Sequence, residues 1–314
     1  YKKDWGFCVE QKNLKKILTY KKKFYVNIDT KFKKSKMIFG EILIKGKSKK
    51  EILISTYICH PSMANNETSG IAVVTFLTKW IKKLDRKYSY RIIFIPETIG
   101  AIAYINKNLK ILKKNVIAGY VVTCVGDNRN YSFLPSKNNN TLSNKIAKHV
   151  LKWHFPKFKE YSWLDRGSDE RQFCAPGVDL PIASIMRTKY GKYKEYHTSL
   201  DNFKNVVSAD GLIGSLTLLK LIIKSLETNC IPLSNIICEP FLTKYNLYPK
   251  LSNIHSLTKG QINSTRLIMH IISYSDGKVS LLDIADKCNV PIWEINKLIE
   301  TLKNKKIIKI KSIQ

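Results

Sequence analysis

The chain has 314 residues, 44% of them hydrophobic, which is enough for a sizeable core and about two domains. No stretch approaches the ~18 consecutive apolar residues needed to cross a bilayer, so the composition excludes a membrane-spanning protein. The seven cysteines form no CxxC pair, which argues against a disulfide framework or a cysteine-only zinc site. We therefore expect reduced thiols in a cytoplasmic protein.

The formal net charge of +30 comes from 54 basic and 24 acidic residues and has two interpretations. One is binding to nucleic acid or to an anionic surface. The other is a lysine-rich solvated surface, which we favour because lysines occur along the whole chain and arginines are scarce. Such a surface would still bind polyanions weakly at low salt.

Residues 1–48 predict a β-rich subdomain. The segments FYVNIDTKF and KMIFGEILIKG alternate apolar with polar residues and contain glycine turns, a pattern typical of antiparallel strands. The chain begins in the middle of a pattern and without Met, so we expect this subdomain to be shortened at its N-terminus.

Residues 49–235 predict an α/β domain with a mainly parallel mixed sheet flanked by helices. Buried strands are indicated by the apolar segments EILISTYI, YRIIFIP, VIAGYVVTCVG and LPIASIM. Helical periods occur between and after them, in GIAVVTFLTKWIKKL, TLSNKIAKHVLKW and DGLIGSLTLLKLIIKSLE. The alternation of strands with helices is typical of α/β folds.

Residues 236–262 contain Pro240 and Pro249 and predict a linker, and residues 263–314 predict a winged helix. Three helices are expected: STRLIMHIISYSDG, then SLLDIADKC with Ser280 as its N-cap, then VPIWEINKLIETLKNKK with Pro at its start. The segment IIKIKS then predicts a strand. Three helices, a tight turn and a β-ribbon make up a winged helix-turn-helix.

Polar residues gather where the predicted strands end. His60 follows the first strand, Glu97 the second and Asp127 the third, and His197 lies in a later loop. Ligands bind at the carboxyl ends of strands in open α/β sheets. A metal hydrolase needs imidazole and carboxylate ligands at one point, and a further carboxylate that accepts a proton from water. These residues could meet that demand, whereas we expect the other four histidines to be packed or on the surface.

The motifs CHPSMANNETSG, PETIG, SDERQFCAPGVDLPIASI and YHTSLDN resemble those of di-zinc aminopeptidases of the bacterial leucyl-aminopeptidase type and of the related glutaminyl cyclases. More specifically, the chain resembles a bacterial aminopeptidase-like family with a winged-helix tail, often encoded beside surface-polysaccharide genes. The resemblance covers nearly the whole chain and implies the zinc exopeptidase fold. Members usually carry more sequence ahead of the motif DWGFC.

The resemblance also implies roles for individual residues. His60 and His197 match the first and the last metal ligand of the aminopeptidase pattern. Glu97 matches the glutamate that acts as general base, and Asp169 matches an aspartate that lies beside the metal in the cyclases.

Three anionic ligands of the di-zinc pattern are replaced. Asn66 stands where a bridging Asp is expected, Thr98 replaces a Glu and Thr123 replaces an Asp. Two divalent ions ~3.5 Å apart need bridging negative charge, which an asparagine amide cannot supply. We therefore expect at most one zinc ion, held by the three ligands His60, Asp169 and His197.

Arg166 and Arg171 flank the predicted aspartate ligand and are candidate substrate-binding residues. An arginine pairs with a carboxylate or a phosphate through two parallel hydrogen bonds. The alternative is a structural ion pair with Asp165 or Glu170, and the sequence does not separate the two possibilities.

Asn66, Asp127 and Tyr196 complete the predicted substrate-binding set. Asn66 could alternatively satisfy the backbone of its own turn, as asparagine often does. The thiols of Cys59 and Cys124 are adjacent to the predicted site in the sequence, and we expect both to pack in the core.

Together these features predict a cytoplasmic zinc-dependent hydrolase that cleaves a terminal amide bond of a small peptide or an N-acylated substrate, through a metal-activated water. The alternatives are acyl transfer or deacylation in surface-polysaccharide metabolism, and a non-catalytic binding scaffold. For the tail we expect protein interaction or homo-oligomer formation rather than sequence-specific DNA binding. Its third helix carries Glu294 and Glu300 and has its lysines mainly at the C-terminal end.

Overall fold

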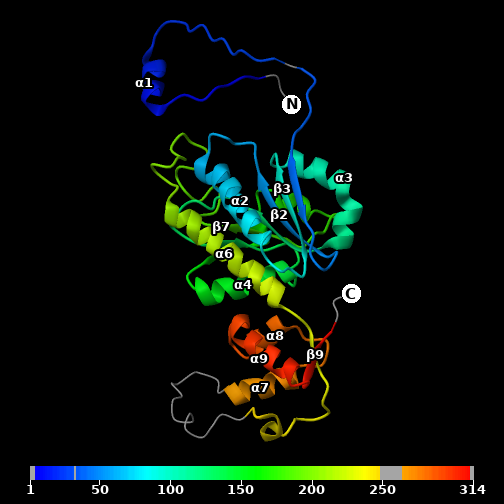
Figure 1. Cartoon of the computed structure of the whole chain (residues 1–314). Helices are drawn as coiled ribbons and strands as arrows, with labels where there is room; N and C mark the ends of the chain where they lie inside the picture. The colour runs from blue at the N-terminus through cyan, green and yellow to red at the C-terminus, as the bar shows by residue number, and fades with distance from the viewer. Residues whose placement is uncertain (1–3, 32, 248–263, 312–314) are drawn as a thin grey trace.

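The computed structural model describes residues 4–31, 33–247 and 264–311. A sheet domain occupies the middle of the molecule, and a smaller helical domain packs at one end of it (Figure 1). Residues 4–31 and 33–39 run outside the sheet domain on the opposite side. No helix among the described residues is long and apolar enough to cross a membrane.

The central sheet has seven strands among the described residues, and they form a mixed, mostly parallel arrangement. The inner four are parallel to one another, β1 is antiparallel to β3, β5 is antiparallel to β7, and β6 pairs with β5 in parallel. This confirms the predicted fold class. In spatial order the strands are β1 (Gly40–Ile44), β3 (Ser89–Ile95), β2 (Glu51–Tyr57), β4 (Val116–Val122), β7 (Ile182–Met186), β5 (Ser132–Leu134) and β6 (Lys159–Glu160).

Helices cover both faces of the sheet, which is why the inner strands are buried and mostly apolar. Ile52 and Ile54 of β2 pack with α2 (Ser69–Ile81), α4 (Leu142–His154) and α6 (Ala209–Thr228). The intervening Leu53 points to the other face, against α3 (Ile99–Asn115) and α5 (Glu170–Phe173). Since side chains alternate along a strand, a strand buried on both sides needs an unbroken apolar run. Figure 1 shows α2, α4 and α6 on one side and α3 on the other.

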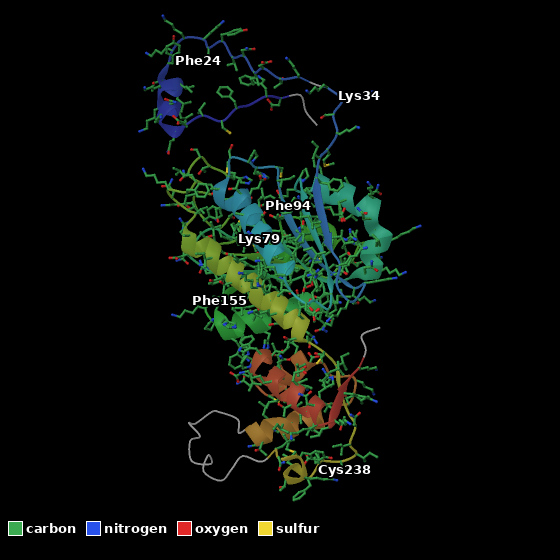
Figure 2. The ribbon with its side chains drawn as sticks, in the orientation of Figure 1. Phe24, Lys34, Lys79, Phe94, Phe155 and Cys238 are labelled. Atoms are coloured by element: carbon green, nitrogen blue, oxygen red, sulfur yellow. The ribbon has the colours of Figure 1, made fainter. Side chains whose placement is uncertain are left out.

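The predicted β-rich subdomain over residues 1–48 is not what the structure contains. Residues 11–19 form helix α1 (Gln11–Thr19), which has no buried residue, and the described part of 20–39 contains no strand. β1 belongs to the main sheet, where it pairs with β3 at the edge. Alternating residues form a strand only when an edge is available for pairing. Phe24, labelled in Figure 2, lies far from the sheet and is 53% exposed.

The C-terminal domain is a winged helix, as predicted. It contains α7 (Ser264–Ser273), α8 (Leu281–Lys287) and α9 (Ile292–Asn304), followed by β9 (Ile308–Ile310). The hydroxyl of Ser280 accepts a hydrogen bond from the Asp283 N–H at 3.2 Å, which confirms the predicted N-cap.

The boundary of the winged helix differs from the prediction. β8 (Pro232–Ser234), which we placed at the end of the α/β domain, pairs antiparallel with β9 and is part of this domain. Pairing between segments so distant in the sequence leaves no local signal. Of the predicted linker, residues 236–247 are irregular apart from a 3-10 turn at Leu242–Tyr245, and 248–262 lie outside the described residues.

A histidine joins the two domains. The side chain of His149, on α4, is fully buried, and its Nε2 accepts a hydrogen bond from the backbone N–H of Ile292 at 2.9 Å. Its Nδ1 lies 2.7 Å from Oδ1 of Asp286 on α8. His149 therefore binds the first turn of α9 and the end of α8 at once. Lys145 and Asp283 add an ion pair of 2.8 Å between α4 and α8.

Candidate metal centre

Cys59, His60 and Glu97 form the group of potential metal ligands that the described part of the chain contains. Their ligand atoms all lie within 4.8 Å of one another. The group forms because β2 and β3 are neighbouring parallel strands, so the residues that follow them meet at one edge of the sheet. Sγ of Cys59 lies 3.1 Å from Nδ1 of His60 and accepts the backbone N–H of Glu97 at 3.1 Å.

Cys59 was predicted to pack in the core, but its side chain is exposed beside His60. The chain leaves the sheet at Tyr57, so the alternation that buries the strand has ended by residue 59. Burial of part of the thiol raises its pKa, and the Glu97 N–H lowers it. The nearby carboxylate of Glu67 raises it further. Cys124 is buried, as predicted, and none of the seven cysteines forms a disulfide.

His197 lies beside this group, although it is not a member of it. Its ring stacks on His60, with 5.4 Å between ring centroids, and on Tyr196 at 3.9 Å. The loop is tied to the end of β2 by Asp201, whose buried carboxylate accepts the backbone N–H groups of Asn65 at 2.6 Å and of its neighbour at 3.0 Å. The structure thus brings the two predicted histidine ligands together.

Asp169 lies on the other side of Glu97 and is fully buried. Its Oδ1 accepts the backbone N–H of Thr98 at 2.7 Å, and its Oδ2 has no hydrogen-bond partner among the described residues. Burial raises the pKa of Asp169 to about 7. Asp169 is outside the group within 4.8 Å, so its role as a ligand, like that of His197, stays a prediction.

Asn66 and Thr123, which the resemblance matched to anionic metal ligands, lie in a hydrogen-bond network without formal charge. Oδ1 of Asn66 accepts the hydroxyl of Tyr57 at 2.6 Å. The hydroxyl of Thr123 contacts that of Tyr57 and lies 2.8 Å from the backbone oxygen of Asn66. Burial raises the pKa of Tyr57 well above its usual value, so its hydroxyl stays protonated. Asn66, Tyr57 and Thr123 therefore supply no bridging charge.

Two predicted substrate-binding residues are buried. Asp127 accepts hydrogen bonds from the backbone N–H and hydroxyl of Thr188, at 2.9 and 2.7 Å, and from the N–H of Arg129 at 3.0 Å. It is 0% exposed, so it holds these loops and faces no substrate. Asn66 is 1% exposed and offers only its Nδ2 group, which has no hydrogen-bond partner in the described structure.

The two predicted arginines are exposed near the centre. Nη2 of Arg171 donates to the hydroxyl of Thr98 at 2.9 Å, and Arg166 lies over a tryptophan ring. The sequence left open that these arginines form structural ion pairs with Asp165 or Glu170. Among the described residues neither arginine forms such a pair. Both guanidinium groups remain available to an anionic group of a substrate.

Four residues around the centre were missed or misread in the sequence. Cys59 could have been found, because it directly precedes His60 at a strand end. The carboxylate of Glu67 accepts the backbone N–H of His60, and this contact lies within one motif. Ser168 donates a hydrogen bond to Glu97, and Asp201 accepts one from the backbone N–H of Asn65. Each contact joins segments far apart in the chain, so only the fold reveals it.

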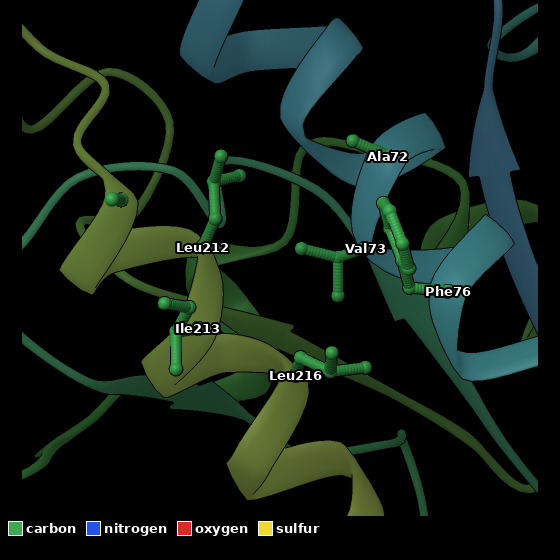
Figure 3. A pocket seen from close by; sticks show the side chains of 7 residues that line it. Ala72, Val73, Phe76, Leu212, Ile213 and Leu216 are labelled. Carbon is green, nitrogen blue, oxygen red and sulfur yellow. The ribbon is translucent and has the colours of Figure 1, made fainter. Parts of the chain in front are cut away.

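A separate apolar groove of about 300 Å³ lies between α2 and α6 (Figure 3). It contains no titratable side chain, so it offers nothing for acid–base or metal chemistry. Its lining consists of Ala72, Val73, Phe76, Ala209, Leu212, Ile213 and Leu216.

Comparison with known proteins agrees with this architecture. The family described as Domain of unknown function (DUF4910) matches residues 9–229, and a winged helix-turn-helix family matches residues 231–310. A Clostridium acetobutylicum protein, provisionally named a polysaccharide biosynthesis protein with an aminopeptidase-like domain, is 36% identical over 99% of this chain and 70% of its own length.

Solved structures give the fold. A crystal structure from C. acetobutylicum, provisionally named a peptidase, is 36% identical and has a TM-score of 0.78, with 87% of this chain and 60% of that chain covered. This chain therefore spans less than two thirds of that relative. An aminopeptidase from Aneurinibacillus sp. strain AM-1 is 17% identical with a TM-score of 0.51, covering 59% of this chain and 47% of that one.

A zinc aminopeptidase from Bacillus subtilis is 16% identical with a TM-score of 0.50, covering 60% of this chain and 49% of that one. At such identities the likeness shows the fold alone. The matches over nearly the whole chain carry more, and they agree with the sheet domain and the tail described above. The chain belongs to the DUF4910 family of aminopeptidase-like domains, followed by a C-terminal winged helix.

Proposed function

We propose that the chain is a zinc-dependent hydrolase that cleaves a terminal amide bond. One observation carries this proposal: a thiol, an imidazole and a carboxylate converge within 4.8 Å at the carboxyl ends of two neighbouring strands, with a second imidazole stacked on the first. In an aminopeptidase-like fold this edge of the sheet is where ligands are expected.

The residues present fit a zinc ion. His60 and His197 offer imidazole nitrogens, and Asp169 offers a buried carboxylate oxygen without a hydrogen-bond partner in the described structure. Imidazole and carboxylate are common zinc ligands. The neutral network around Asn66 favours a single ion. A zinc ion held here would polarise the amide carbonyl and acidify a water molecule.

Glu97 is the residue that would accept a proton. Ser168 donates to its Oε1 at 2.6 Å, which fixes the carboxylate and directs proton acceptance to Oε2. The backbone N–H of Glu97 donates a hydrogen bond to Sγ of Cys59, and the backbone N–H of Thr98 donates one to Asp169. A general base positioned in this way contributes ~10²–10⁴-fold to a reaction rate.

The substrate we propose is a small peptide or an N-acylated compound that carries an anionic group. Arg166 and Arg171 provide two exposed guanidinium groups near the centre, without carboxylate partners in the described structure. The ring of Tyr196, stacked on His197, offers a flat surface beside them. The name of the C. acetobutylicum relative adds the possibility that the acyl group belongs to a sugar of a surface polysaccharide.

The test is turnover of two panels by the zinc-loaded protein: aminoacyl anilides, and N-acetylated amino sugars with and without a phosphate. Hydrolysis in either panel that Glu97→Gln removes would support the proposal and assign the substrate class. The matched control is Glu160→Gln, since Glu160 is exposed and pairs with Lys148. Turnover that is equal in wild type and Glu97→Gln would overturn it. Acyl transfer to an added amine, without release of free acid, would favour transferase activity.

For the tail we propose protein interaction or self-association rather than specific DNA recognition. The first turn of α9, which would enter the major groove in a DNA-binding winged helix, abuts α4 instead. Trp293 lies against His154 of α4, with 4.4 Å between ring centroids. The exposed side of α9 carries Glu294 and Glu300 as well as Lys297 and Lys303, so its charge is mixed and not the basic surface that phosphate contacts require.

A further inference from the structure

We propose that Cys59 is a thiolate ligand of the metal centre, so that the site selects a thiophilic divalent cation such as zinc, cobalt(II) or cadmium. This inference rests on the metal centre of the proposed function, but not on the reaction. The ligand set expected from the sequence contained only imidazole and carboxylate groups, and Cys59 was placed in the core.

The geometry is that of two ligands on one ion. Sγ of Cys59 lies 3.1 Å from Nδ1 of His60, and both lie within 4.8 Å of a carboxylate oxygen of Glu97. Two ligands held tetrahedrally by one zinc ion, at the usual Zn–S and Zn–N lengths, lie about 3.5 Å apart. The thiol is therefore placed where a zinc ligand would be, with little movement required.

The local charge also calls for a cation. The carboxylates of Glu67, Glu97 and Asp169 surround this position, and none of them has a lysine or arginine within 4.0 Å among the described residues. Asp169 is 0% exposed and keeps one oxygen without a hydrogen-bond partner there. In a chain with a net charge of +30, three acids without a lysine or arginine at this distance stand out, and the basic group that pairs with one of them, His60 with Glu67 at 3.5 Å, is itself a proposed ligand.

A catalytic thiol is the competing interpretation, and the surroundings disfavour it. Nucleophilic cysteines lie in electropositive environments that stabilise the thiolate. Cys59 instead lies among carboxylates, with Glu67 bonded to the neighbouring His60. A bound cation reverses this balance: an Sγ–metal bond forms, the thiol proton leaves to solvent, and no oxidant or reductant is required.

The test is cobalt(II) binding to the zinc-depleted, reduced protein, followed by absorbance. A thiolate bound to cobalt(II) gives a sulfur-to-metal charge-transfer band in the near ultraviolet, which nitrogen and oxygen ligands do not give. We expect the band in wild type and in the control Cys238→Ser, and its loss in Cys59→Ser. Cys238 is exposed and lies far from the sheet, in the C-terminal part of the molecule (Figure 2). Zinc affinity should fall more than about 100-fold in Cys59→Ser. Mutating a residue that only hydrogen-bonds a metal ligand typically lowers metal affinity about 10–100-fold, and loss of a ligand itself should cost more.

A second measurement uses wild type alone, in case Cys59→Ser misfolds. Zinc should slow alkylation of Cys59 by iodoacetamide, read by peptide mass spectrometry, and leave Cys238 unaffected. Two results would refute the claim that Cys59 is a metal ligand, without affecting the proposed function. One is cobalt(II) that binds without the charge-transfer band, and the other is an alkylation rate of Cys59 that zinc leaves unchanged. A band without any amide hydrolysis would support the ligand while removing the proposed function. Failure to bind either metal would overturn both.

Discussion

His149→Ala should loosen the tail from the sheet domain. The change removes the acceptor of the buried Ile292 N–H, and a buried donor left without a partner costs ~1–3 kcal/mol. It also removes the contact with Asp286, whose side chain is 45% exposed, so this adds at most about 1 kcal/mol. The sum is about 1–4 kcal/mol, or roughly 5- to 1,000-fold in an opening equilibrium.

The assay is amide hydrogen exchange of peptides from α9, residues 292–304, followed by mass spectrometry. The control is His154→Ala, one turn further along α4, because His154 contacts the same helix through Trp293 but is less buried. We expect the control to lower protection by about tenfold or less. Equal protection of α9 in wild type and His149→Ala would refute the assignment of His149 as the residue that joins the domains.

Three further predictions concern the centre and the tail. Glu97→Gln should keep the metal and lose ~10²–10⁴-fold in turnover, measured by metal analysis and initial rates; loss of the metal instead would make Glu97 a ligand. In chelated protein, burial raises the pKa of Asp169 to about 7, whereas in the unfolded chain its pKa is near 3.8. Between these two pH values the folded protein holds a proton that unfolding releases. The free energy of unfolding therefore falls as the pH rises through this window. Urea titrations should show Asp169→Asn gaining stability over wild type as pH rises through the window, and a constant difference would contradict the burial argument. The whole chain should bind DNA at low salt, but at ~150 mM salt a selected duplex should compete no better than random DNA; a preference of ~10³ or more would make the tail a specific DNA reader.

The sheet domain was predictable because its strands and helices have strong local patterns. The segments at β2, β3, β4 and β7 are mostly apolar, and burial on both faces of the sheet explains why. The prediction of a β-rich N-terminal subdomain was wrong. Leu14, Ile17 and Leu18 have the spacing of one helix face, but the alternation of apolar and polar residues around Tyr25 suggested strands for the whole segment. The short strands β5 and β6 were missed because two or three residues carry no periodicity.

The centre was predictable only in part. His60 and Glu97 follow segments that were predicted as strands of a mainly parallel sheet, so a common edge was expected, whereas the pairing of β2 with β3 that brings them together comes from the structure. The approach of His197 depends on Asp201 holding its loop to the turn after β2, which is a contact between distant segments. Asp127 was predicted to bind substrate because it follows a strand. A carboxylate in that position can equally accept hydrogen bonds from neighbouring loops, as Asp127 does from Thr188 and Arg129.

The central claim is that the cluster after β2 and β3 holds one zinc ion. The direct measurement is elemental analysis of protein expressed with added zinc and desalted, for wild type, His60→Ala and the control His270→Ala in the tail. We expect about one equivalent of zinc in wild type and in His270→Ala, and almost none in His60→Ala, because the proposed site has few protein ligands and His60 is one of them. Two equivalents in wild type, no zinc at all, or full zinc content in His60→Ala would contradict it.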